Sequence, residues 1–323
     1  MEQRKRNADD RPGSRGGQKG SGNREFRSAP RRESDRPKTA QQRPESAQRA
    51  ANSRGRSTAE TFRKGSEKKK LSASGAADNL CWGRNPVLTL LENKPSLCQS
   101  VILMEGAQDT FRDRVADLCV QADIPLQFAG RDELDALTEG GVHQGIAARM
   151  SPVTPVSLDS VTEQISADEP ALIVLMDHCQ DPHNLGAVIR TAEIAGAACV
   201  VCQNDRSATV NGTVIKTSAG AAFRLPVVQV VNTRRAIEEL KKQGFWVVGL
   251  DHNTDETIWS SPLPERMVLV VGSEGEGISP LVSKNCDKLV KFPMAGATGN
   301  LNASVAAALG MFEWVRLHGA GAQ

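Results

Sequence analysis

Short apolar runs alternate with segments of helical periodicity from Ala171 onward, and this alternation constrains the fold more than any other feature of the chain. The run Ala171–Met176 is apolar without interruption, which is typical of a strand buried on both faces of a parallel sheet. Further strands are predicted at Ala198–Val201, Val227–Val230, Trp246–Leu250 and Val268–Val271. Helices are predicted at Leu185–Ala195, Val214–Ala222, Arg234–Gln243 and, approximately, Ser304–Leu317. This order predicts an α/β fold with an open parallel sheet covered by helices on both faces.

A smaller α/β domain is predicted in front of this one. Its strands are expected at Val101–Met104, Leu126–Phe128 and Gly145–Ala148, and its helices at Thr110–Ala122 and Arg131–Leu137. The polar segment Ser151–Pro170 contains several prolines and is interpreted as a linker. The predicted division is therefore residues 1–79, 80–150, 151–170 and 171–323.

The first 79 residues are rich in Arg, Gly, Ser, Gln and Pro, with almost no large apolar side chains. Such a segment cannot bury enough surface to fold alone, so we expect a disordered tail. Residues 1–70 carry 21 Lys and Arg against 9 Asp and Glu, whereas the remainder carries 19 against 29. The basic tail is interpreted as an electrostatic arm for RNA or DNA, with a merely solubilising tail as the alternative.

No apolar segment has the length of a membrane-spanning helix, and no apolar leader begins the chain, so a cytoplasmic protein without a membrane partner is expected. The seven cysteines are odd in number and scattered, as in reduced cytoplasmic proteins. Cys199 and Cys202 have the spacing of a metal or redox pair, but they lie in a predicted buried strand and no second pair accompanies them. We therefore expect no metal.

Three unusual loops follow predicted strands, at Asp177–Asn184, Gly272–Gly277 and Met294–Asn302. Ligands of open parallel sheets bind outside the carboxyl ends of the strands, where such loops would meet. The loop Gly272–Gly277 lacks both the dinucleotide and the P-loop pattern, and its Glu274 and Glu276 would repel phosphates. It favours a ligand without phosphate or with positive charge, such as S-adenosylmethionine, unless it is only a tight turn with solvated carboxylates.

The other two loops each lead into a helix. Asn184 can cap the helix that follows it, and Arg190 farther along that helix lies either on the solvated surface or along a packed edge. The segment Phe292–Ala307 turns through a proline, passes small residues and enters an alanine-rich helix. Small residues and unpaired helix N–H groups let a ligand approach the backbone closely.

Together the three loops resemble the SpoU/TrmH family of RNA ribose 2′-O-methyltransferases. The resemblance is carried by Asp181-Pro182-His183-Asn184-Leu185-Gly186-Ala187 through Arg190, by Val270-Val271-Gly272-Ser273-Glu274-Gly275-Glu276-Gly277, and by Phe292-Pro293-Met294-Ala295-Gly296 through Leu301-Asn302-Ala303-Ser304-Val305-Ala306. The front domain, ending in Gly141–Ala147, is similar to the small substrate-binding domain of ribosomal RNA members. The resemblance begins at about Leu80, so the tail lies outside it.

The resemblance implies a deep trefoil knot in the C-terminal part of the sheet, with S-adenosylmethionine held in a bent shape. Gly272, Phe292, Met294 and Leu301 match positions that meet the cofactor. It also implies a homodimer with the site near the interface, and a front domain that binds structured RNA. Ribosomal and transfer RNA both remain open as substrates, and guanosine is the commonest target in the ribosomal branch.

The implied reaction moves the sulfonium methyl group to a ribose 2′-hydroxyl. The family account makes Arg190 the base; we favour a charged clamp on the neighbouring RNA phosphate, because neutralising a guanidinium at pH 7 costs about 7–9 kcal/mol. Asn184 and Asn302 would orient substrate or shape the loops, and Glu274 would hold Arg190 or its own loop. Asn300 stands where the family usually has serine. That departure leaves an RNA-binding protein with lost or reduced catalysis as the alternative function; methylation of a base nitrogen is disfavoured by Arg190.

Overall fold

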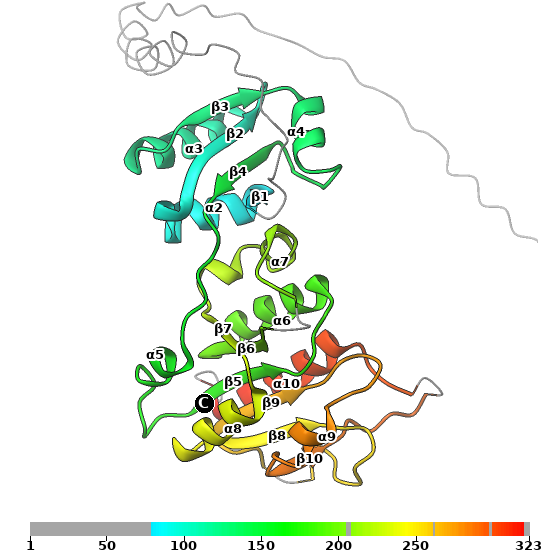
Figure 1. Ribbon diagram of the computed structural model, residues 1–323. Coiled ribbons are helices and arrows are strands. Elements are labelled where there is room, and N and C mark those ends of the chain that lie inside the picture. The colour runs from blue at the N-terminus through cyan, green and yellow to red at the C-terminus, as the bar shows by residue number, and fades with distance from the viewer. Residues whose placement is uncertain (1–78, 205–207, 261, 297–298, 320–323) are drawn as a thin grey trace, which may run out of the picture. The chain divides into compact units, whose positions relative to one another are not determined.

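The computed structural model describes residues 79–319 except 205–207, 261 and 297–298, and these residues form two β-sheets with their helices (Figure 1). The predicted basic tail lies outside the described residues. No helix in the described part of the chain is both long enough and apolar enough to cross a membrane.

The larger sheet has six strands in the order β10-β8-β9-β5-β6-β7, and every neighbouring pair is parallel. The strands are β5 (Ala171–Met176), β6 (Cys199–Gln203), β7 (Val227–Val230), β8 (Trp246–Leu250), β9 (Arg266–Val271) and β10 (Lys288–Val290). The predicted open parallel sheet is confirmed. Only β10 was not predicted, because a strand of three residues with one lysine has no recognisable period.

Helices cover both faces of this sheet (Figure 1). The helices and turns of this part of the chain are α6 (Pro182–Ile194), α7 (Gly212–Thr217), the 3₁₀ turn η3 (Ala221–Phe223), α8 (Thr233–Lys242), α9 (Pro280–Ser283) and α10 (Ala303–His318). On β5, Leu172 and Val174 belong to the cluster that includes residues of α6 and α10, whereas Ile173 and Leu175 belong to the cluster that includes residues of α8. Because successive side chains of a strand point to opposite faces of the sheet, β5 contributes to the packing of helices on both faces.

The predicted helix Val214–Ala222 is wrong in its second half. The α-helix α7 ends at Thr217, and Ala219 and Gly220 both take left-handed φ angles, of 52° and 87°. A left-handed residue ends the regular helix, and the chain continues as the short η3 turn.

The smaller sheet has four strands in the order β1-β4-β2-β3. They are β1 (Leu80–Trp82), β2 (Cys98–Met104), β3 (Leu126–Ala129) and β4 (Ile146–Met150), accompanied by α2 (Arg84–Asn93), the 3₁₀ turn η2 (Pro95–Leu97), α3 (Asp109–Gln121) and α4 (Arg131–Leu137). β2 pairs in parallel with β3, and β4 runs antiparallel to both of its neighbours. Strand β1 and helix α2 were not predicted from the sequence.

The segment interpreted as a linker also contains a short helix, α5 (Leu158–Thr162). Ser157 caps it by accepting a hydrogen bond from the Ser160 N–H at 3.1 Å. Leu158 and Val161 are buried in the cluster on the α8 face of the large sheet. Leu158 and Val161, separated by three positions, therefore attach this segment to the large sheet, although its polar composition predicted a loop.

The buried-strand interpretation of Cys199 and Cys202 is confirmed. The two side chains lie on opposite faces of β6, in different clusters, and burial raises the pKa of each thiol to about 12. Neutral thiols on opposite faces cannot share a ligand. In the part of the chain that the structure describes, no group of three His, Cys, Asp or Glu side chains could hold a metal ion.

Candidate functional site

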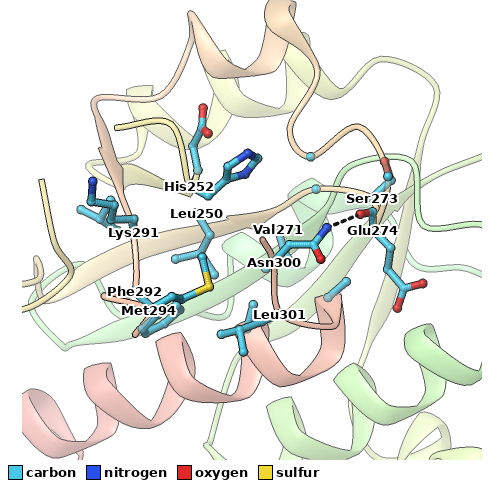
Figure 2. A pocket seen from close by; sticks show the side chains of 17 residues that line it. Leu250, His252, Val271, Ser273, Glu274, Lys291, Phe292, Met294, Asn300 and Leu301 are labelled. Carbon is cyan, nitrogen blue, oxygen red and sulfur yellow. Dashed lines mark hydrogen bonds between the residues drawn. The ribbon is translucent and has the colours of Figure 1, made fainter. Parts of the chain in front are cut away.

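A pocket opens at the carboxyl ends of three neighbouring strands, β8, β9 and β10, with one wall formed by α10 (Figure 2). It encloses about 660 Å³ when its open mouth is included. It is lined by Leu250, Asp251, His252, Val271, Gly272, Ser273, Glu274, Gly275, Gly277, Val290, Lys291, Phe292, Met294, Asn300, Leu301, Ala303 and Ala306. This is the edge at which an open parallel sheet is expected to bind its ligand.

The loop after β9 is held in one tight conformation. The backbone N–H of Ser273 donates to the Gly277 carbonyl and the N–H of Gly277 donates to the Ser273 carbonyl, both at 3.0 Å. A Cβ atom on Gly272 would lie 2.0 Å from the Gly277 carbonyl carbon, so only glycine fits there. The buried Asp177 braces the far side of this loop, where its Oδ2 accepts a hydrogen bond from the Ser279 N–H at 2.8 Å.

Glu274 joins this loop to both of the others. Its Oε1 accepts hydrogen bonds from Asn184 Nδ2, at 2.9 Å, and from Asn302 Nδ2. Asn302 Nδ2 also lies 3.1 Å from Asn184 Oδ1. These three side chains are 28 to 118 residues apart in the chain, so only the fold brings them together. Three of the four predicted catalytic residues therefore form one hydrogen-bonded network.

The positions of the two asparagines follow from where helices α6 and α10 begin. Asn302 is the N-cap of α10, and its Oδ1 accepts from the N–H groups of Ser304 and Val305 at 2.9 and 3.3 Å. The predicted capping role of Asn184 is wrong. Helix α6 begins earlier, at Pro182, and Asp181 is its N-cap. Proline is favoured in the first helical turn because its missing N–H would be unpaired there. Asn184 is thereby left inside the helix, free to reach Glu274.

Arg190 stands apart from the network. It is exposed on α6, it is not among the residues that line the pocket, and it makes no hydrogen bond or ion pair with another described residue. The suggested contact with Glu274 is accordingly not among those the structure describes. Glu274 holds two asparagines instead.

The four predicted cofactor residues, Gly272, Phe292, Met294 and Leu301, all line the pocket (Figure 2). The end of β8 and the loop after it were not predicted as part of the site, although Leu250, Asp251 and His252 also line the pocket. The strand before this loop was predicted, but its neighbours in the sheet were not. Ligands of open parallel sheets bind outside the carboxyl ends of the strands, so knowing that β8 lies beside β9 would have been enough to include these residues in the predicted site.

The residues of the pocket fit S-adenosylmethionine. Apolar side chains that suit an adenine ring are contributed by Leu250, Val271, Phe292, Met294 and Leu301. Phe292 packs against Trp259 in a T-shaped arrangement, with ring centroids 6.2 Å apart. Asp251 and Glu274 line the same pocket, and their negative charges would attract a ligand that carries positive charge.

Two family models match the chain. The model described as "SpoU rRNA Methylase family" matches residues 171–312, and "RNA 2′-O ribose methyltransferase substrate binding" matches residues 80–156. The first match contains the six-stranded sheet and the pocket, and the second contains the four-stranded sheet.

Curated relatives and solved structures agree with these models. The 23S rRNA (guanosine-2′-O-)-methyltransferase RlmB of Escherichia coli K12 is 37% identical over 73% of this chain and 98% of that protein. The protein of the same name in Pseudomonas putida is 38% identical over 73% of this chain and 95% of its own length. The SpoU methyltransferase AviRb from Streptomyces viridochromogenes, solved in complex with the cofactor AdoMet, shares the fold, with a TM-score of 0.63 at 23% identity over 74% of this chain and 89% of that one.

Proposed function

We propose that this chain, which belongs to the SpoU rRNA methylase family, methylates the ribose 2′-hydroxyl of a guanosine in 23S ribosomal RNA with S-adenosylmethionine. The relatives that match over nearly their whole length carry this activity in their names. Bound S-adenosylmethionine supplies an electrophilic methyl group on its sulfonium. As the new C–O bond forms, the bond from the methyl group to sulfur would break, the hydroxyl proton would pass to a phosphate oxygen or water, and S-adenosylhomocysteine would be the other product.

The observation that carries this proposal is the convergence of three distant loops on Glu274, a residue that lines the pocket. Glu274 lines the pocket, and two asparagine amides fix the position of its carboxylate. A carboxylate held in this way can orient a hydroxyl or a cation without having to reorganise during the reaction. Asn184 and Asn302 act here as positioning residues.

Arg190 is proposed as a clamp on the phosphate next to the target ribose. It lies six residues beyond Asn184, which turns it about 240° around the helix and moves it about 9 Å along the axis. The two side chains therefore leave α6 in different directions. Arg190 can serve a pocket most simply when a second copy of the chain presents it.

A homodimer accounts for an apolar stripe on α10. Val305, Leu309 and Phe312 are 46–47% exposed and lie on one helical face. Ile194, one turn after Arg190 on α6, is 63% exposed.

Light scattering should report a dimer, and Leu309→Asp should yield monomers while Val120→Asp, at an exposed position of α3, should not. A monomeric wild-type chain would contradict the proposal.

We propose the division at residues 79, 150 and 170, with the four-stranded domain binding structured RNA and the knotted arrangement around the pocket that the family resemblance implies. We expect the protein to act in the cytoplasm, where it would meet ribosomal RNA.

The test is a mass-spectrometric map of 2′-O-methylation in ribosomal and transfer RNA, with and without the gene. Loss of one guanosine methyl group in 23S RNA is expected, with its return when the purified protein and S-adenosylmethionine are added. Arg190→Lys should bind cofactor normally yet lose more than about tenfold in turnover, because lysine cannot form the bidentate contact. If no RNA loses a methyl group, the binding-only alternative is correct.

A further inference from the structure

Asn300 lies in the loop after β10 and lines the pocket, at the position where the family resemblance leads one to expect serine. Its Nδ2 donates a hydrogen bond to the main-chain carbonyl oxygen of Glu274 at 3.0 Å (Figure 2). This contact spans 26 residues and joins the loop after β10 to the loop after β9. Serine at this position would end one bond closer to the backbone.

The chemistry of the partner fixes the orientation of the amide. A carbonyl oxygen can only accept, so the nitrogen of Asn300 must face Glu274 and its Oδ1 must point elsewhere. Among the hydrogen bonds between described residues, Oδ1 has no partner. One N–H of this amide is therefore committed to the neighbouring loop, and its second N–H and Oδ1 have no partner among the described residues.

Glu274 is consequently held at two places. Asn300 holds its main chain, and Asn184 and Asn302 hold its carboxylate. Asn300 and Asn302 flank Leu301, which lines the pocket opposite the loop that Glu274 belongs to (Figure 2). The two linked loops thus enclose the pocket between them.

We propose that Asn300 is a positioning residue that ties these two loops together around S-adenosylmethionine, and so governs how tightly the cofactor is held rather than the rate of methyl transfer. This inference rests on the proposed function. Asn300 then positions the loops of the pocket, whereas the serine expected at this position would offer a hydroxyl group to the reaction.

The test measures cofactor affinity by calorimetry, and turnover at saturating cofactor and RNA, for Asn300→Ala, Asn300→Ser and Asn300→Asp. Loss of one hydrogen bond should weaken binding roughly 2- to 13-fold in Asn300→Ala. Asn300→Ser should behave like Asn300→Ala because its hydroxyl is too short. Asn300→Asp should bind more weakly than either, because an acceptor then faces the Glu274 carbonyl. Turnover at saturation should stay within about threefold of wild type in all three.

Asn285→Ala is the matched control. It removes the same kind of bond, from an asparagine Nδ2 to the Leu281 carbonyl at 2.8 Å, away from the pocket lining. It should leave cofactor affinity unchanged. Wild-type affinity in Asn300→Asp, or lost turnover with unchanged affinity, would overturn the role of Asn300 alone. A wild-type chain that binds no S-adenosylmethionine would overturn the proposed function as well.

Discussion

Two polar networks in this molecule differ in how much of the chain they need. In the four-stranded domain, His143 Nε2 donates to Asp135 Oδ1 at 2.9 Å, and its Nδ1 accepts from the Gly145 N–H at 3.0 Å. These partners are eight and two residues away in sequence. The network of Glu274 instead joins residues up to 118 positions apart.

The two networks also differ in what they leave unpaired. His143 is buried and both of its ring nitrogens have partners, so nothing remains for a ligand. Glu274 lines a pocket, and its Oε2 accepts no hydrogen bond from another described residue. A local network with every group paired braces a turn, whereas a long-range network with an unused acceptor can serve a reaction.

The strongest test of this difference is Glu274→Ala. Removing the carboxylate leaves two asparagine amides without their shared acceptor, and turnover should fall roughly 100-fold. The midpoint of thermal unfolding should change by only a few degrees. Glu276→Ala is the control, because that carboxylate, two residues on, has no partner among the described residues. Equal activity in both variants would show that the network of Glu274 only stabilises the local structure, as the network of His143 does.

The next effect, on cofactor binding rather than on turnover, is expected from Gly272→Ala. The added Cβ would meet Gly277 backbone atoms at 2.0–2.2 Å, and backbone cannot move aside as a flexible side chain can. Overpacking of this kind costs about 1–3 kcal/mol, which should weaken S-adenosylmethionine binding roughly 5- to 150-fold in calorimetry. Gly275→Ala, where a Cβ would meet no atom within 4 Å, should bind normally. The loop does not shape the pocket if the two variants have the same affinity.

The smallest effect on the site should come from His143→Ala. It leaves the Gly145 N–H and the Asp135 carboxylate without their partner, at a cost of about 1–3 kcal/mol in folding free energy. Thermal unfolding should shift down by several degrees, while cofactor affinity stays at the wild-type value. Val142→Ala, at the exposed neighbouring position, should change neither quantity. A drop in cofactor affinity for His143→Ala would mean that the two networks are coupled.

Much of the fold could be predicted because its signals are local. Ala171–Met176 is a strand over the predicted residues, since six consecutive apolar side chains suit only a fully buried strand or a buried helix, and the run is too short for a helix. The end of α7 at Thr217 could not be predicted, because it depends on Ala219 taking a left-handed conformation that its own side chain disfavours.

Part of the candidate site could be predicted because some of its residues stand in local sequence motifs. Gly272, Phe292, Met294 and Leu301 stand in sequence motifs, and the structure places all four on one pocket. Asp251 and His252 stand in no motif, and they reach the pocket because β8 lies between β9 and β10. Strand order is decided by which surfaces bury each other, and no single segment carries that information.

The sequence by itself determined the class of sheet, the three loops and the kind of ligand they favour, since periodicity, glycine and charge act within a few residues. Only the tertiary structure decided that Asn184 reaches Glu274 and that Asn300 binds a carbonyl. Hydrogen bonds form over about 3 Å, and the distances between loops are set by packing of the whole sheet. The identity of each side chain was available from the start, but its partner was not.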